Sequence, residues 1–337
     1  MTRSTHTLIL DQGPLDVTVD LHGRQGRPFL LLHGGGGPQT VAPFAGLLAE
    51  QRQARVFSPV HPGFDGTARP GWLTDVTTLA QVYAQLLDAF DLRDVSVVGN
   101  SIGGWIAAEL ATLGSDRISS VTLVNAVGIH VPGHPIADTF GLTPVELSRL
   151  SFHDPSKFRF DPSALSEAQR AVMATNRATL QVYSGPHAMA DPTLAERLAK
   201  VAHPTLVAWG ASDQVVDADY GRAYAQAVPG AEFRLLPGTG HMPQSETPGA
   251  TAAGGMGLRR RPRHQSAAPL SPLPRAYAVR TAKAGRLGDD RPGVQRRTFS
   301  RRRSRRCRRR RRWRCPRCSR PPEPSACPSG RRSRPGG

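Results

Sequence analysis

The chain has 337 residues, with 44 Lys and Arg against 26 Asp and Glu, and a formal net charge of +18. Residues 1–253 carry 17 basic and 23 acidic side chains, whereas residues 254–337 carry 27 basic and 3 acidic ones. The basic balance therefore describes only the last quarter, which is too polar and too rich in Arg, Pro and Gly to form a second globular domain. The first 253 residues are long and apolar enough to bury a substantial core.

The cysteines and the N-terminus indicate the compartment. Cys307, Cys315, Cys318 and Cys327 all lie beyond residue 253, so the first part has no disulfide framework. The N-terminus lacks the uninterrupted apolar core of a signal peptide, and no apolar run is long enough to cross a bilayer. We expect a cytoplasmic protein that does not contact a membrane.

Short apolar runs alternate with helical patterns along residues 1–253, as is typical of a mostly parallel sheet with helices on both faces. In chain order we predict strands at 7–10, 15–21 and 28–32, a helix at 41–51, a strand at 55–60, a helix at 75–90, a strand at 95–99, a helix at 103–113, and strands at 121–124, 204–209 and 233–236. Residues 130–200 show helical patterns without a clear strand, which predicts a helical cap inserted between two core segments, 1–129 and 201–253.

A serine stands between a predicted buried strand and a predicted helix. Residues 99–103 read Gly-Asn-Ser-Ile-Gly and fit G-x-S-x-G, with Ser101 at the centre. In this setting the flanking glycines permit a tight turn that exposes the serine oxygen and aims the following helix's N–H groups at the reaction centre. Ser101 is therefore our candidate nucleophile, and the alternative is an ordinary N-cap serine.

A serine hydroxyl needs a base and a group that orients the base. His241 follows the last predicted strand in a glycine-containing loop, and Asp213 follows the strand at 204–209. We predict His241 as the base and Asp213 as its partner. Asp217 and Asp219 are rival acids, but they fall in the first turn of a predicted helix, where acidic residues are favoured anyway.

The developing negative oxygen of acyl transfer needs preset backbone N–H donors. One donor is predicted to be the N–H of Ile102, directly after Ser101. The other is predicted in the loop at residues 33–37, His-Gly-Gly-Gly-Gly, at Gly35. The spacing of these glycines fits neither common phosphate-binding loop. We interpret His33 as a structural anchor of this loop.

These motifs together resemble the α/β-hydrolase superfamily. The resemblance rests on the glycine loop at 33–37, His-Pro-Gly-Phe at 61–64, the serine turn at 99–104, Trp-Gly-Ala-Ser-Asp at 209–213 and Gly-His at 240–241, and it covers residues 1 to about 253. It implies an eight-stranded, mostly parallel sheet, a helical cap over the site, no cofactor and a small-molecule substrate. The superfamily includes esterases, cofactor-independent haloperoxidases and hydrolases of carbon–carbon bonds.

The resemblance also limits the reaction. Dehalogenases and epoxide hydrolases of this superfamily use an aspartate nucleophile, so Ser101 argues against both. Asn100 is similar to the carbon–carbon hydrolases, in which a cap arginine, here Arg170 or Arg177, holds a substrate carboxylate; Met242 stands where those enzymes usually have Trp. We predict a serine hydrolase that cleaves an ester or a carbon–carbon bond of a small, partly apolar substrate.

From residue 254 the sequence departs from this family. Residues 301–312 are arginine except for Ser304 and Cys307. Such a segment predicts disorder and salt-sensitive phosphate binding. Trp313 is a candidate for stacking on a base, while Cys315 and Cys318 lack a second pair of metal ligands, so we predict no metal site.

Two alternatives follow from this segment. One is a nucleic-acid-binding protein that acts through its basic residues. The other rests on the GC-rich codons of the dominant amino acids, which suggest a shifted reading frame from near Ala253. In that hypothesis the chain is a catalytically impaired hydrolase that lacks its last helix.

Overall fold

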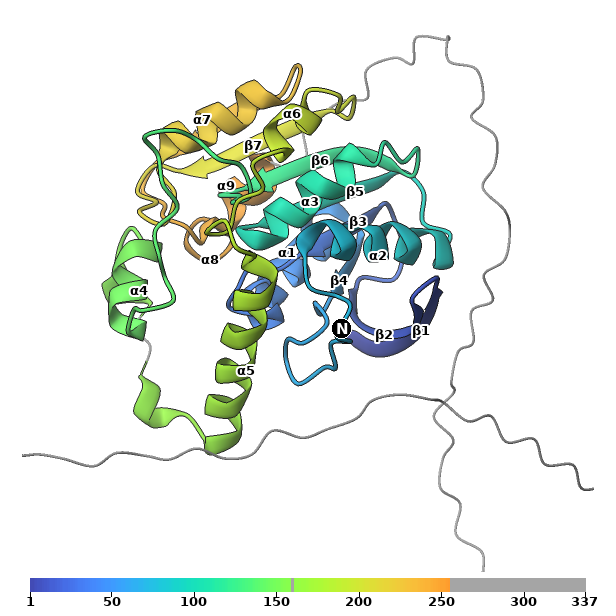
Figure 1. Cartoon of the computed structure of the whole chain (residues 1–337), viewed down its shortest axis with the longest axis horizontal. Helices are drawn as coiled ribbons and strands as arrows, with labels where there is room; N and C mark the ends of the chain where they lie inside the picture. Colours follow the sequence, from blue (N-terminus) through green and yellow to red (C-terminus); the bar gives the residue numbers. More distant parts are fainter. Residues whose placement is uncertain (159–160, 255–337) are drawn as a thin grey trace, which may run out of the picture. The chain divides into compact units, whose positions relative to one another are not determined.

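The computed structural model describes residues 1–158 and 161–254 (Figure 1). Their centre is an eight-stranded sheet in the order β1-β2-β4-β3-β5-β6-β7-β8. β2 pairs antiparallel with β1 and β4, and every other neighbouring pair is parallel. This confirms the predicted mostly parallel α/β-hydrolase sheet. The strands are β1 (Thr2–Leu10), β2 (Gly13–His22), β3 (Pro28–Leu32), β4 (Arg55–Pro59), β5 (Val95–Asn100), β6 (Ile118–Val124), β7 (Thr205–Gly210) and β8 (Glu232–Leu236).

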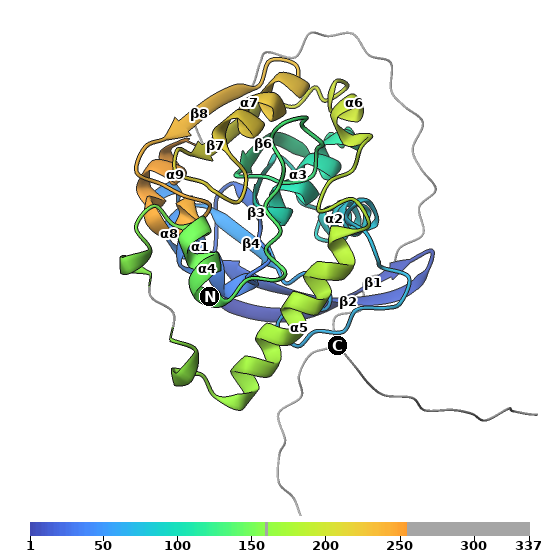
Figure 2. The ribbon, with the colours of Figure 1, turned by 60° about the vertical axis from the view of Figure 1, so that its left-hand side comes forward.

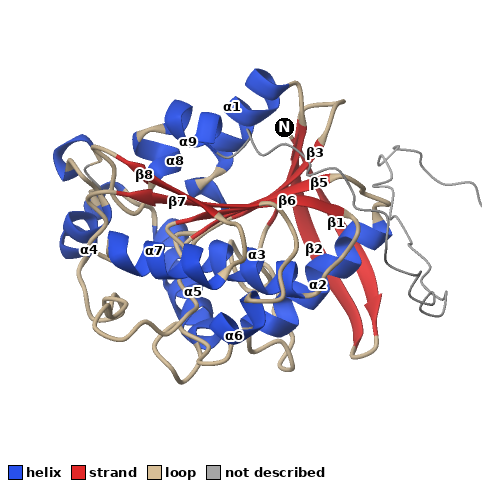
Figure 3. Ribbon diagram, turned by 90° about the horizontal axis from the view of Figure 1, so that it is seen from above, coloured by secondary structure: helices blue, strands red, loops and turns tan. Residues whose placement is uncertain are grey.

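Helices cover both faces of this sheet. Figure 3 shows α1, α8 and α9 on one face and α2, α3 and α7 on the other. The α-helices are α1 (Ala42–Arg52), α2 (Val76–Ala89), α3 (Ile102–Thr112), α4 (Pro144–Ser151), α5 (Glu167–Ser184), α6 (Leu194–Leu198), α7 (Ala218–Ala227), α8 (Pro243–Glu246) and α9 (Pro248–Gly254). Three short 3-10 helices are η1 (Pro38–Thr40), η2 (Pro155–Lys157) and η3 (Pro162–Ala164).

The alternation along β3 shows why these strands are apolar on both faces. Leu30 and Leu32 belong to the larger buried cluster, whereas Phe29 and Leu31 belong to a second one. Successive strand residues point to opposite faces of a sheet, so β3 contributes to a core on each side. An unbroken apolar run is the pattern expected of such a doubly covered strand.

Element boundaries differ most at the N-terminus. The predicted strand at 7–10 begins five residues earlier, because β1 pairs with β2 along its whole length, from Thr2 opposite Leu21. Most side chains in the first half of β1 are exposed and polar, so they carry no apolar signal. The predicted helix at 75–90 forms as α2, with the Asp75 side chain accepting a hydrogen bond from the N–H of Thr78 at 2.7 Å.

The segment between β6 and β7 contains α4, η2, η3, α5 and α6. Its described residues form helices and loops, with one isolated bridge between Gly128 and Ala190. In Figure 2, α4 and α5 extend from the sheet toward the same side. The proposed division into a core and a cap at 130–200 agrees with these elements and stays a prediction.

The described chain ends with α9, where Ala252 is fully buried beside β3 and α1 residues and Arg52 donates to its carbonyl oxygen at 3.2 Å. The predictions for the arginine-rich segment, Trp313 and the four cysteines fall outside the described residues, as does the altered reading frame beyond residue 254. Among the helices that the structure describes, none is both long and apolar enough to span a bilayer.

Candidate active site

Ser101 lies in a sharp turn between β5 and α3. Its backbone has φ 56° and ψ −121°, a conformation that costs an L-residue about 1–3 kcal/mol. The turn is tight enough to require glycines on both sides. A Cβ on Gly99 would lie 2.0 Å from the carbonyl oxygen of Gly103, and a Cβ on Gly103 would lie 2.3 Å from that of Leu32. The strained serine and its glycines match the geometry of a nucleophile turn.

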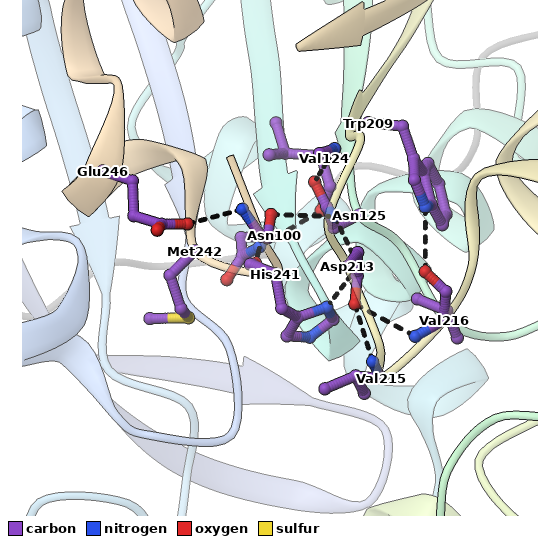
Figure 4. Close-up of polar contacts among 12 residues, drawn as sticks. Asn100, Val124, Asn125, Trp209, Asp213, Val215, Val216, His241, Met242 and Glu246 are labelled. Atoms are coloured by element: carbon purple, nitrogen blue, oxygen red, sulfur yellow. Dashed lines mark hydrogen bonds and ion pairs between the residues drawn. The ribbon is translucent and has the colours of Figure 1, made fainter. Parts of the chain in front are cut away.

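His241 and Asp213 form a buried hydrogen-bonded pair at the ends of β8 and β7 (Figure 4). The Nδ1–H of His241 donates to Asp213 Oδ2 at 2.8 Å. Asp213 Oδ1 accepts from the backbone N–H groups of Val215 at 2.8 Å and Val216 at 3.1 Å. These bonds fix the carboxylate and the orientation of the His241 ring.

Asn125, which the sequence reasoning missed, also binds the carboxylate. It follows β6 with φ 47°, is fully buried, and its Nδ2 donates to the same Asp213 oxygen as His241 does. Its Nδ2 also donates to the carbonyl oxygen of Gly240 at 3.3 Å, and its Oδ1 accepts from the N–H of Gly210 at 3.2 Å. The available signal was its place at the carboxyl end of a parallel strand, where such side chains converge.

Several hydrogen bonds hold the His241 loop. Asn100 Nδ2 donates to the His241 carbonyl oxygen at 3.0 Å, and the His241 N–H donates to the Ser151 carbonyl oxygen at 2.7 Å (Figure 4 shows the first). The N–H of Gly240 donates to a Glu246 carboxylate oxygen at 2.5 Å. The loop is thus tied to the end of β5, to the C-terminus of α4 and to α8.

The rival acids have other partners. Asp217 is the N-cap of α7, where its Oδ1 accepts from the N–H of Tyr220 at 2.8 Å, and its Oδ2 contacts His134 Nδ1 at 2.7 Å. Asp219 lies in the first turn of α7 and accepts from Arg222 at 3.2 Å. Of the three aspartates, Asp213 is the one that contacts His241.

The glycine loop at residues 33–37 lies against the nucleophile turn. A Cβ on Gly34 would lie 3.3 Å from the Ser101 Cβ. The Gly34 carbonyl oxygen accepts from His33 Nδ1 at 2.8 Å and from the Gly37 N–H at 3.1 Å. In a trans peptide the carbonyl and the following N–H point in opposite directions, so the Gly35 N–H points away from these two donors. Ile102 is the first residue of α3, and its N–H has no partner within the helix.

Two stacked histidines support this loop. The rings of His33 and His61 are fully buried with centroids 3.7 Å apart, and His33 Nε2 accepts from the His61 N–H at 3.1 Å. His61 Nε2–H donates to the His33 carbonyl oxygen at 2.9 Å, and the Tyr83 hydroxyl donates to His61 Nδ1 at 2.5 Å. These hydrogen bonds require both rings to be neutral, because one nitrogen of each ring accepts. Burial lowers the pKa of His33 to about 4, opposed by its bond to Gly34, and burial lowers the pKa of His61 well below its usual value.

We therefore expect acid to destabilise the fold before the carboxylates protonate. Because the folded-state pKa of His33 is depressed, the unfolded chain binds a proton near pH 6.5 while the folded chain does not. The stabilisation is complete above pH 6.5 and is lost as pH falls toward about 4, by about 3 kcal/mol for His33. Urea unfolding from pH 7.5 to 4.5 measures this loss. His33→Asn should make the free energy of unfolding depend less steeply on pH over this range. An unchanged dependence would contradict the depressed pKa of His33 as the cause.

A cavity of about 550 Å³ lies over Ser101. Ser101, His241 and Gly35 line it together with residues from the segment between β6 and β7, most of them apolar. Of the residues predicted to bind substrate, Asn100, Arg177 and Met242 also line the cavity. Asn100 is largely engaged by backbone groups and by Gln244 Nε2, which donates to its Oδ1 at 3.1 Å.

Arg170 is placed differently from Arg177, and its predicted contact with substrate stays a prediction. It is exposed and stands apart from the described residues that line the cavity. The rise of α5 separates the two arginines, seven positions apart, by about 10 Å along the helix axis. Met173, three residues from Arg170 on the same helix, does line the cavity, so Arg170 lies less than one turn beyond the lining residues.

Comparisons with known proteins agree with this fold. A family model described as alpha/beta hydrolase fold matches residues 27–248. The chain belongs to this family. It is 28% identical over 240 residues to the dihydrolipoyllysine-residue acetyltransferase component of an acetoin cleaving system from Pseudomonas putida, covering 67% of this chain and 62% of that protein. The match thus spans less than two thirds of that relative's length.

Two further relatives are matched over most of their length. A 2-hydroxymuconate semialdehyde hydrolase from Pseudomonas putida is 26% identical over 241 residues, which cover 68% of this chain and 85% of that protein. The crystal structure of a hydrolase from Pseudomonas aeruginosa PA01 is similar with a TM-score of 0.59 and 26% identity, covering 76% of this chain and 99% of that one.

Proposed function

We propose that this protein is a serine hydrolase that cleaves an ester or a carbon–carbon bond of a small, partly apolar substrate. The observation that carries the proposal is the strained Ser101 turn beside the His241–Asp213 pair at one cavity. A strained backbone at a cavity with a hydrogen-bonded base is the arrangement expected of an activated nucleophile. The hydrolases among its relatives support the same class of reaction.

In the proposed mechanism these groups act in sequence. Ser101 Oγ attacks the substrate carbonyl carbon while His241 Nε2 accepts the hydroxyl proton. The resulting oxyanion accepts hydrogen bonds from the N–H groups of Gly35 and Ile102, and each such bond contributes about 3 kcal/mol to the barrier reduction. The oxyanion then collapses, the bond between the carbonyl carbon and the leaving group breaks, and His241 gives its proton to the leaving group. In the second half His241 takes a proton from water, the hydroxide attacks the acyl carbon, and the bond to Ser101 Oγ breaks as His241 returns the proton to it.

The contacts of the His241 loop bear on the alternative of an impaired enzyme. That alternative requires the loop to move when a final helix is missing. In the described residues the loop accepts a hydrogen bond from Asn100 and donates to Ser151 and Glu246. All three partners lie before residue 254. They favour an active arrangement over an impaired one.

The direct test is hydrolysis of p-nitrophenyl butanoate by the full chain and by Ser101→Ala. We expect the variant to lose at least about 10³-fold in kcat, because nucleophile and base act as one unit. The matched control is Ser245→Ala, an exposed position in α8 close to His241 in the chain. Equal activity of Ser101→Ala and the wild-type chain would contradict the proposal.

A further inference from the structure

The charge of the substrate can be inferred from the cavity wall. Among the described residues that line the cavity, the ionisable side chains are His241 and Arg177. His241 is committed to Asp213 and to the proposed proton transfer. Whether the cavity can bind an anion therefore depends on how Arg177 is held.

Arg177 has its terminal nitrogens directed at backbone carbonyl groups. Nη2 donates to the carbonyl oxygens of Thr139 at 3.2 Å and Leu142 at 3.5 Å, and also to that of Phe140. Nη1 donates to the Leu142 oxygen at 3.4 Å. These bonds attach the loop at residues 139–142 to α5.

This geometry leaves no free pair of donors for a carboxylate. A guanidinium binds a carboxylate bidentately through Nη1 with Nη2 or through Nε with Nη2, so both arrangements use Nη2. Because carbonyl oxygens already occupy Nη2 of Arg177, a bidentate anion would have to displace the 139–142 loop. Arg177 is thus a structural residue of the cavity wall.

The neighbouring residue offers a neutral donor instead. Asn176 lines the cavity and is 3% exposed. Its Oδ1 accepts from the N–H of Asp65 at 2.8 Å, which fixes the orientation of the amide. Its Nδ2 is buried and has no partner among the described residues. A Cβ on Gly37 would lie 2.8 Å from this nitrogen, so the donor stands at the end of the glycine loop.

An unpaired buried donor is unfavourable, and an acceptor supplied by a bound molecule removes that cost. We propose that the substrate is neutral and mainly apolar, and that it carries a neutral acceptor oxygen (an ether, hydroxyl or second carbonyl) that accepts a hydrogen bond from Asn176 Nδ2. Anionic substrates are disfavoured because the guanidinium of Arg177, the cation among the described lining residues, already donates from Nη2 to carbonyl oxygens of the 139–142 loop. This inference rests on the proposed serine hydrolase function.

The first test needs no variant. The full chain is given p-nitrophenyl esters of matched acyl length: pentanoate, three ethers with the oxygen moved along the chain, and the monoester of glutarate. We expect kcat/KM for the glutarate monoester to be at least about tenfold below the best ether and below pentanoate, because a carboxylate entering this cavity loses its water and finds no free bidentate partner. Equal or faster hydrolysis of the glutarate monoester would overturn the inference.

The second test assigns the donor. Asn176→Asp keeps an acceptor for the Asp65 N–H, whereas Asn176→Leu is an apolar replacement of similar size; both remove Nδ2. In both variants we expect kcat/KM for the best ether, relative to pentanoate, to fall about fivefold to tenfold, as for one lost neutral hydrogen bond. Arg177→Gln should leave this ratio within about twofold. An unchanged ratio in both Asn176 variants would overturn the assignment.

Labelling by a fluorophosphonate distinguishes a failure of the neutral-substrate inference from a failure of the proposed serine hydrolase function. A labelled chain that prefers the glutarate monoester contradicts the neutral substrate and leaves the serine hydrolase intact. A folded chain that is neither labelled nor active on any of the esters contradicts the proposed function, and the inference fails with it.

Discussion

Asp213→Asn will lower kcat by about 10⁴-fold and leave the fold intact. The reason lies in the donors around the two carboxylate oxygens. Oδ1 accepts from two fixed backbone N–H groups, of Val215 and Val216, whereas Oδ2 accepts from the Asn125 amide and from His241, whose ring can change tautomer. The introduced amide will therefore place its oxygen at the Oδ1 position. Its NH₂ group then faces His241 Nδ1 and forces the proton onto Nε2. The nitrogen that must accept the serine proton is no longer basic.

Asp217→Asn is the matched control for this prediction. It makes the same chemical change at the N-cap of α7, where asparagine caps a helix about as well as aspartate. We expect its kcat to remain within about twofold of the wild-type value. Steady-state hydrolysis of a p-nitrophenyl ester measures both variants. A large loss in Asp217→Asn, with Asp213→Asn active, would reassign the acid.

Removing Arg197 will destabilise the fold more than any surface charge change. Glu109 lies on α3, the helix that follows Ser101, and its side chain is 1% exposed. Arg197 donates from Nη1 at 2.5 Å and from Nη2 at 2.7 Å to its two carboxylate oxygens. Arg197→Ala leaves this carboxylate buried without a cation, which costs about 3–5 kcal/mol.

The loss in Arg197→Ala is measured as a change in the free energy of unfolding in urea at pH 7. Two further variants serve as controls. Arg222→Ala breaks an exposed pair with Asp219 and should cost less than about 1 kcal/mol. The double variant Glu109→Gln with Arg197→Met removes both charges and should recover most of the loss. A double variant no more stable than Arg197→Ala would show that the buried charge is not the cause.

The sheet could be predicted because its signals are local. The strands in the middle of the sheet are apolar on both faces, as β3 illustrates, and the turn between β5 and α3 requires glycines at positions 99 and 103. The contact between Asp213 and His241 could be predicted for a related reason. Both residues directly follow parallel strands, and the carboxyl ends of such strands meet at one edge of the sheet.

The remaining contacts depend on distant segments, so one chain could not reveal them. Asn125 contacts Asp213 across 88 positions, and Asn176 contacts Asp65 across 111. The place of Asn125 after a parallel strand indicates the edge of the sheet but does not identify its partner, and Asn176 on a helix carries no such signal. Arg170 and Arg177 were equivalent in the sequence. The structure separates them because Arg177 lines the cavity, whereas Arg170, two turns from Arg177 on α5, is exposed and is not among the described residues that line it.

The most direct test of the account is covalent labelling of the full chain by a fluorophosphonate, with peptide mass spectrometry to locate the label. Such a probe modifies a serine that a neighbouring base activates. We expect the label to be attached to Ser101 and to disappear in Ser101→Ala, while Ser245→Ala is labelled like the wild-type chain. A folded chain that stays unlabelled, or a label that persists in Ser101→Ala, would contradict it.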